Sequence, residues 1–160
     1  YNQEFYKLAK SRLADDGVLQ QWVQLHHLNP TDILSIITTL RSEFQYVTLY
    51  TVGGQGILIA TNHNAKKDQS TEAISALKSV AGLESIRQNL DDSMEVIAGK
   101  RMLTHAQVDR YITEIGIEPS LWISTDDNAK LEYSTPKANA NDSDRSFTNN
   151  ISILTKFRQK

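Results

Sequence analysis

Apolar and polar positions along residues 1–61 predict two helices and three strands. In the helices, apolar side chains recur three and four residues apart, which is the spacing of one buried helix face. The strands are short apolar runs bounded by turn-forming residues. The expected elements are a helix over 3–13, a strand over 18–25, a helix opened by Asn29-Pro30 with Ile33, Ile36, Ile37, Leu40 and Phe44 buried, and strands over 46–52 and 56–61.

The order of these elements predicts how the strands run. A strand, a helix and a second strand in succession form a right-handed crossover between parallel strands. Gly53-Gly54-Gln55 joins the second and third strands tightly, so the third strand runs antiparallel to the second. A sheet that ends in this way is typical of the methyltransferase-type α/β fold. The predicted fold is α/β, the C-terminal half of a Rossmann-like, methyltransferase-type sheet ending in an antiparallel hairpin; a smaller, different arrangement is the alternative.

The remaining residues predict a mostly helical extension. The first expected helix begins at Thr71 and has Ala73, Ile74, Leu77 and Val80 on one face, and a short helix is expected between Asp92 and Gly99. A Thr104–Gln107 capping box opens a third helix, in which Val108, Tyr111, Ile112 and Ile115 are expected to face inward. Extended segments are expected at Trp122-Ile123 and Leu131-Glu132-Tyr133, and loop or disorder over 134–150. The chain is thus expected to consist of an α/β part over 1–61, a helical extension over 62–137 and a polar tail over 138–160.

Composition and charge narrow the class of protein. Seventeen Lys and Arg against nineteen Asp and Glu give a net charge of −2, which leaves little basis for binding nucleic acid. Without cysteine, the chain forms no disulfide, thiolate metal site or cysteine nucleophile. No apolar run approaches the roughly 20 residues that span a bilayer. We expect a cytoplasmic protein with no membrane span in this chain, and leave open spans elsewhere in a longer parent protein.

Few residue patterns suggest chemistry. His26 and His27 are adjacent, so on a strand they point to opposite faces and cannot share a metal ion. The Gly53–Gly56 turn precedes a strand and offers no helix N-terminus to a phosphate. Asp126-Asp127 has the character of a turn or capping pair. Gln20-Gln21-Trp22 puts two amides in a strand, where they are either satisfied within the core or lie near a ligand at the end of the strand.

Two blocks of the sequence carry a family pattern. The first reads Glu4-Phe5-Tyr6-x-Leu8-Ala9, Arg12-Leu13 and Gly17-Val18-Leu19-x-Gln21-Trp22, and the second reads Thr125-Asp126-Asp127-Asn128-Ala129-Lys130-Leu131-Glu132-Tyr133-x-x-Pro136. The first resembles the segment after the catalytic loop of spermidine synthase-like proteins, the polyamine aminopropyltransferases, especially their long, fused bacterial forms. The second is similar to the C-terminal Thr-Asp-Asp-x-Pro-x-Leu-Glu-aromatic signature of that family, with Ala129 in place of the usual proline. The resemblance covers residues 1–61 and 120–137.

The resemblance implies a parent enzyme of polyamine biosynthesis, an aminopropyltransferase-like transferase. Such an enzyme moves an aminopropyl group from decarboxylated S-adenosylmethionine, its co-substrate, to a polyamine such as putrescine. The family's glycine-rich cofactor loop, ribose-binding acid and catalytic aspartate would all precede Tyr1, so we expect no catalytic residue and no cofactor in this chain, and no turnover by it alone. Gln21 and Tyr50 are the substrate-binding residues that the resemblance suggests.

Two other functions stay open on the sequence alone. The chain could be a non-catalytic interaction or regulatory domain on the same scaffold, or a fragment of an S-adenosylmethionine-dependent methyltransferase. The expected partner of the parent is a small polyamine, and a homodimer is left open.

Overall fold

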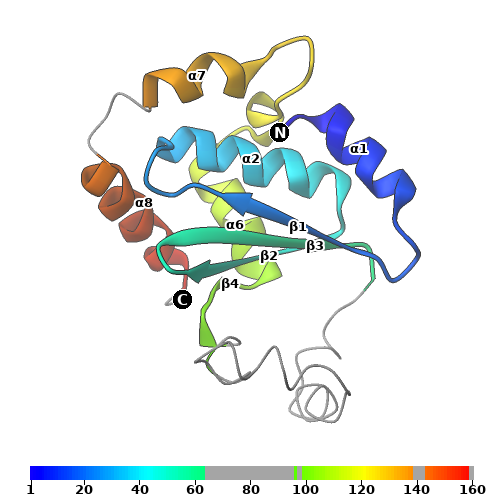
Figure 1. Cartoon of the computed structure of the whole chain (residues 1–160), viewed down its shortest axis with the longest axis horizontal. Coiled ribbons are helices and arrows are strands. Elements are labelled where there is room, and N and C mark those ends of the chain that lie inside the picture. The colour runs from blue at the N-terminus through cyan, green and yellow to red at the C-terminus, as the bar shows by residue number, and fades with distance from the viewer. Residues whose placement is uncertain (64–95, 97–98, 139–142, 159–160) are drawn as a thin grey trace.

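The computed structural model describes residues 1–63, 96, 99–138 and 143–158, arranged as helices against one face of a four-stranded sheet (Figure 1). The elements are α1 (Gln3–Arg12), β1 (Val18–Val23), α2 (Pro30–Glu43), β2 (Tyr46–Val52), β3 (Gln55–Thr61), β4 (Arg101–Leu103), α6 (His105–Gly116), the 3₁₀ helix η1 (Pro119–Trp122), α7 (Lys130–Ala138) and α8 (Ser143–Arg158). The helices and strands expected within residues 1–61 are therefore confirmed.

The sheet has the strand order β1-β3-β2-β4, and every neighbouring pair is antiparallel. β1 and β2 run in the same direction with α2 between them, as the crossover predicted, but β3 lies between the two strands. The α/β class and the antiparallel β2–β3 hairpin are confirmed. No two neighbouring strands are parallel in the described sheet, because the hairpin folds β3 back into the gap that the crossover leaves.

The β2–β3 turn explains the two adjacent glycines. Val52 pairs with Gln55, so Gly53 and Gly54 alone form the turn. Their φ angles are 55° and 80°. A two-residue hairpin turn with positive φ at both positions matches the right-handed twist of the strands, and glycine adopts it without steric cost.

The core lies between the sheet and α2. The face of the sheet toward the helices carries apolar side chains that are at most 2% exposed: Val23, Val47, Leu49, Leu58 and Ala60. The predicted apolar stripe of α2 is buried in full. In α6, Val108, Tyr111 and Ile112 are buried as expected, whereas Ile115 is 42% exposed and was wrongly predicted to face inward.

The polar side of α2 is buried as well. Ser35 Oγ donates a hydrogen bond to the Trp122 carbonyl oxygen at 2.7 Å, and Thr39 Oγ1 accepts one from Ser124 N at 2.9 Å. The hydroxyls thus satisfy the backbone of a segment that crosses α2 on the side away from the sheet. Because these hydroxyls have hydrogen-bond partners, α2 can be buried on its serine and threonine side as well as on the apolar side that faces the sheet.

The C-terminal region departs from the prediction. Residues 131–133 are part of α7 rather than an extended segment, and α8 replaces most of the expected loop and the polar tail over 138–160. Leu154 and Phe157 of α8 are 1% and 5% exposed and belong to the core. The polar residues around 138–146 favour the prediction of a loop, but an apolar series at helical spacing begins at Phe147.

The helical extension is described in part. β4 and α6 are present, and α6 begins with the predicted capping box, in which Thr104 N donates to Gln107 Oε1 at 2.8 Å. The helices expected over 71–80 and between Asp92 and Gly99 lie largely outside the described residues. Among the helices that are described, none is long and apolar enough to cross a membrane.

The face of the sheet away from the helices is here called the open face. Its side chains follow from the strand register and form three cross-strand rows. The rows are Val18–Thr61–Tyr46, Gln20–Ile59–Thr48 and Trp22–Ile57–Tyr50.

Candidate functional site

Gln21 lies on β1 and faces the helices. Its cross-strand neighbour is Leu58, and 8% of its surface is exposed. Its amide nitrogen Nε2 donates a hydrogen bond to the carbonyl oxygen of Trp22 at 2.8 Å. A main-chain group therefore meets part of the hydrogen-bonding requirement of this amide without any ligand.

Tyr50 lies on β2 and belongs to the open face. It pairs with Ile57 on one side and with Arg101 of β4 on the other. Because side chains alternate between the faces of a sheet, Tyr50 and Gln21 project from opposite faces. The structure does not bring the two predicted substrate-binding residues together.

The loop after β1 lies at the carboxyl end of that strand, where open α/β sheets commonly bind ligands. Asn150 of α8 holds this loop and is 1% exposed. Its amide nitrogen Nδ2 donates to the carbonyl oxygens of Leu25 and Leu28, both at 2.8 Å. A side chain from the C-terminal helix thus fixes the backbone of the loop.

The same loop also contacts the hairpin turn. The His26 ring stacks on Phe147 of α8, with 4.4 Å between ring centres and 10° between the planes. Gly54 comes so close that a Cβ there would lie 2.8 Å from His26 Nε2. The end of β1, the β2–β3 turn and α8 therefore meet in one place, here called the hairpin-end cluster. It comprises His26, Gly54, Phe147 and Asn150.

Three polar atoms, on Asn150 and on the chain neighbours of His26 and Gly54, are buried and have no hydrogen-bond partner among the described residues. They are Nδ1 of His27, Oε1 of Gln55 and Oδ1 of Asn150. Two are amide oxygens, which accept hydrogen bonds, and an imidazole nitrogen also accepts in one of its neutral tautomers. Each of these atoms therefore suits a hydrogen-bond donor, such as water or an ammonium group, better than an anion.

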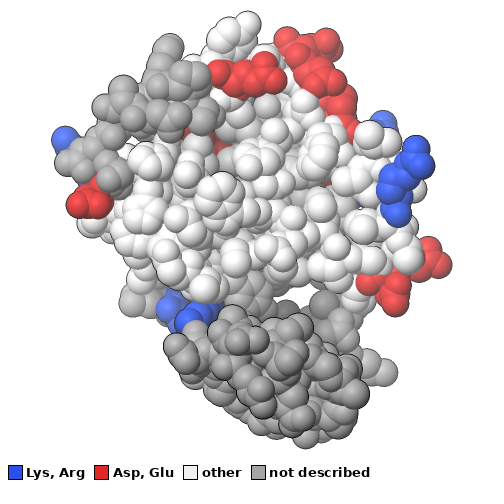
Figure 2. All heavy atoms as spheres, in the orientation of Figure 1, with Lys and Arg blue, Asp and Glu red and all other residues white. Residues whose placement is uncertain are grey.

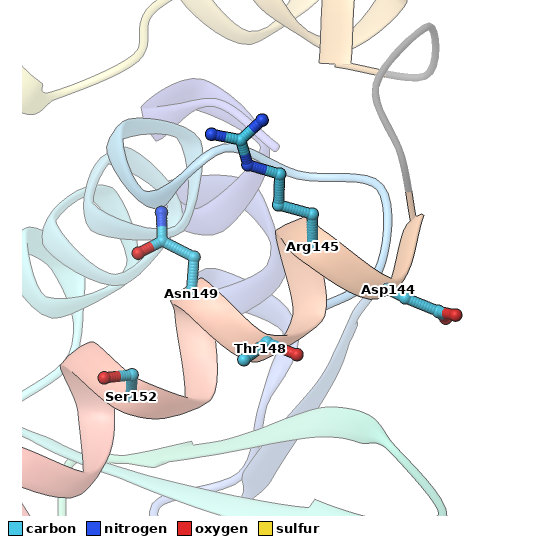
Figure 3. Close-up of a pocket in the computed structure, with 5 residues that line it drawn as sticks. All are labelled: Asp144, Arg145, Thr148, Asn149 and Ser152. Atoms are coloured by element: carbon cyan, nitrogen blue, oxygen red, sulfur yellow. The ribbon is translucent and has the colours of Figure 1, made fainter.

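A hollow of about 600 Å³ lies along the outer side of α8. Figure 3 shows Arg145 and Asn149 pointing to one side of the helix and Asp144 pointing away from them. Among the described residues, Thr148 and Ser152 also line it. This mixture of one acid, one base and small polar groups on a single helix specifies no particular chemistry.

The Thr125–Asn128 turn serves the structure at the start of α1. Asp126 N donates to the Glu4 carboxylate at 3.0 Å, and Asn2 Nδ2 donates to Asp126 Oδ1. Ala129, which follows the turn, has a φ of 42°. Proline fixes φ near −65°, so the proline that the family usually carries does not fit this backbone.

Some titratable side chains form ion pairs, and two tyrosines lie in the core. His105 Nε2 lies 3.4 Å from Asp109 Oδ2, and Arg41 Nε lies 2.7 Å from the other oxygen of the same carboxylate. Burial raises the pKa of the Tyr6 and Tyr111 phenols, which keeps both neutral. The described part of the chain holds no group of three or more histidine and acidic residues that could bind a metal ion.

No protein-family model, curated protein or solved structure matches this chain.

The sequence predicts β1 but not the hairpin-end cluster. Its polar composition predicts a loop or disorder at Phe147 and Asn150, which gives no reason to expect either residue next to residues 25–28. The available signal was the spacing of Phe147, Ile151 and Leu154, which predicts a helix with one apolar face. Asn150 lies one position before Ile151 and could have been placed near that face.

Proposed function

We propose that this chain is the sheet-ending part of an aminopropyltransferase-type domain. The complete domain would transfer an aminopropyl group from decarboxylated S-adenosylmethionine to a polyamine. One observation carries this proposal: the two segments that resemble the family are joined by hydrogen bonds. Gln3 N donates to the Ser124 carbonyl oxygen at 2.8 Å, and Asp126 N bonds to Glu4 across 122 positions of sequence. Segments that belong to one domain are expected to pack in this way.

The outer edge of β1 also supports the proposal. Among the described strands β1 pairs with β3 alone, so its other edge has no partner strand there. The strand contains no charged residue and no proline. Natural edge strands usually carry such residues to prevent pairing with further strands. The edge of β1 therefore suits a sheet that continues, as the resemblance implies for the front half of the domain.

Unpaired acceptor atoms of this chain suit an amine. Ammonium groups donate hydrogen bonds and accept none, and the buried unpaired atoms include two amide oxygens, on Gln55 and Asn150. A single amine on one face of the sheet would reach only one of Gln21 and Tyr50. We assign the substrate contact to Gln21 in preference to Tyr50, because an amide oxygen is an effective acceptor for an ammonium group.

The direct test is a transfer assay on the full-length protein that contains this chain, with labelled decarboxylated S-adenosylmethionine and putrescine. We expect labelled product from the full-length protein and none from residues 1–160 alone, since the cofactor loop and the general base are expected upstream. The proposal fails if the folded full-length protein forms no product with putrescine or with longer polyamines.

The role of Gln21 is tested against its neighbour Gln20, which lies on the opposite face of the same strand. A hydrogen bond to a charged group contributes about 1.5–3 kcal/mol, or roughly a 10- to 100-fold effect. We therefore expect Gln21→Ala to lower kcat/KM for the amine by that factor and Gln20→Ala to leave it nearly unchanged. Equal effects of the two substitutions would assign Gln21 a purely structural role.

The open face favours a second candidate function, a non-catalytic interaction domain. Val18 and Trp22 are 51% and 47% exposed on this face. Figure 2 shows a broad surface without Lys, Arg, Asp or Glu on the side that Figure 1 presents to the viewer, with the charged side chains toward its margin. The assay described above separates the candidates, and S-adenosylmethionine as an alternative donor tests the methyltransferase.

A further inference from the structure

The three most exposed large apolar side chains among the described residues all lie within residues 117–133. Ile117, Tyr133 and Leu121 are 90%, 74% and 63% exposed. Ile117 follows α6, Leu121 belongs to η1, and Tyr133 lies in the first turn of α7. These three residues are here called the η1 surface. Large apolar groups that gather on a protein surface commonly mark an interaction site.

Contacts within this stretch hold its parts next to one another. Trp122 Nε1 donates a hydrogen bond to the Gly116 carbonyl oxygen at 2.8 Å, which closes the loop between α6 and η1. The Lys130 ammonium group lies 4.3 Å from the centre of the Trp122 ring and also donates to the Leu121 carbonyl oxygen. The first turn of α7 is therefore fixed against η1, and both lie beside the end of α6.

The backbone at Ile117 is strained. Its φ and ψ are 53° and −60°, and Glu118 N donates a hydrogen bond to the Gly116 carbonyl oxygen across it. This is a γ-turn with positive φ, a rare and strained turn that suits a β-branched residue poorly. The exposed side chain of Ile117 makes few contacts within the chain that could offset the strain. Strain of this kind is commonly found where a protein contacts a ligand or a partner.

The surroundings of the η1 surface are acidic. Residues 114–133 contain five acidic residues and one basic residue, Lys130, although the whole chain has a net charge of only −2. Glu114 forms an ion pair with Arg110 of the same helix. Figure 2 shows acidic side chains along the upper margin of the view, where Figure 1 places α7 and the turn before it. The other acidic residues of this stretch are Glu118, Asp126, Asp127 and Glu132.

We propose that the η1 surface binds a basic amphipathic helix of a partner protein, in which apolar side chains are flanked by lysine or arginine. The apolar face of that helix would contact Ile117, Leu121 and Tyr133, and its cations would approach the surrounding acidic residues. A second copy of the chain is a poor partner, because a two-fold contact places the same acidic residues on both sides. The inference does not depend on the proposed enzymatic function.

The test is binding of a fluorescent synthetic helix to the full chain. The helix has about 18 residues, or roughly five turns, with leucine on one face and lysine elsewhere. Ile117→Asn removes an apolar contact and suits a positive φ, so we expect it to weaken binding about tenfold while Tm stays the same or rises. Val18→Asn changes an exposed β-branched residue of the open face and is the matched control. It should leave Kd nearly unchanged.

A second pair of variants tests the charges. Glu118→Gln with Glu132→Gln should weaken binding about threefold and reduce its dependence on salt, because exposed charge pairs each contribute modestly. Asp15→Asn with Asp16→Asn removes the same charge from the exposed turn before β1 and should have little effect. Equal weakening by the two pairs would indicate general attraction to an acidic protein and would overturn the proposal.

Chemical-shift mapping keeps the test valid if a variant fails to fold. The leucine–lysine helix should shift the amide signals of residues 114–133 of the unchanged chain more than those of the rest. Largest shifts elsewhere, unchanged binding by Ile117→Asn, or equal binding of a peptide with glutamate in place of lysine would each overturn the proposal. A dimer of the chain that Ile117→Asn dissociates in sedimentation would also overturn it, because a second copy would then cover the surface.

Discussion

Asn150 provides the most informative single perturbation of this fold. Its amide nitrogen donates two hydrogen bonds of 2.8 Å to the carbonyl oxygens of Leu25 and Leu28, and the residue is 1% exposed. Asn150→Leu keeps a side chain of similar length but removes both donors. The substitution therefore leaves two buried carbonyl groups unpaired while it fills the space that water would need.

The expected loss follows from the cost of unpaired buried groups. Each such carbonyl costs about 1–3 kcal/mol, so Asn150→Leu should destabilise the protein by about 2–5 kcal/mol. A domain is typically stable by about 5–15 kcal/mol, so this loss is a large fraction of the total. Asn150→Ala should cost less than Asn150→Leu, because a water molecule can enter the space and donate to the two carbonyls.

Urea unfolding followed by circular dichroism measures these differences, with the slope m checked to be unchanged. Asn149→Ala, an exposed neighbour on α8, is the control and should change stability by less than about 0.5 kcal/mol. If Asn150→Leu costs no more than Asn149→Ala, then α8 is not anchored to the loop after β1. A greater loss for Asn150→Ala than for Asn150→Leu would refute the reasoning about unpaired carbonyls.

Two further substitutions test local features of the fold. Ala129 has a positive φ and its N–H bonds to the Thr125 carbonyl oxygen at 3.0 Å, so Ala129→Pro should lower stability by about 3 kcal/mol or more, whereas Ala129→Gly should be neutral or stabilising in the same urea titration. The Tyr6 hydroxyl is buried without a partner among the described residues, so Tyr6→Phe should cost less than about 1 kcal/mol. Because burial raises the pKa of Tyr6 when the chain is folded, the phenol stabilises the fold fully below its unfolded pKa near 10, and this stabilisation falls as the pH rises above that value. Tyr6→Phe should therefore lessen the loss of Tm between pH 9 and 11, and an unchanged loss would contradict that assignment.

Local sequence signals predicted the helices and strands of the first half, but not how the strands are ordered. The Asn29-Pro30 start of α2 and the Gly53-Gly54 turn each depend on neighbouring residues, and both are present in the structure. The position of β3 between β1 and β2 depends on which side of β2 the hairpin folds. That choice is set by packing among distant residues, which periodicity does not show.

The candidate site was harder to predict because its parts come from three regions of the chain. His26 follows β1, Gly54 lies in the hairpin turn, and Phe147 and Asn150 belong to α8. A polar composition around residues 138–146 suggested a tail, although a helix needs only one apolar face to pack. Gln21 was located correctly on its strand, yet alternation alone could not say which face the helices would cover.

The helices that cover the sheet restrict how a ligand can reach Gln21. α2 and α6 lie on the face to which Gln21 belongs, and 8% of this residue is exposed. Gln21 lies two positions before Val23, the last residue of β1. A ligand that reaches the Gln21 amide therefore has to approach from the carboxyl end of β1. The loop at that end is fixed by Asn150, whose amide nitrogen donates to the carbonyl oxygens of Leu25 and Leu28. An ammonium ligand of this protein is therefore expected beside the loop after β1, rather than against the Trp22–Ile57–Tyr50 row.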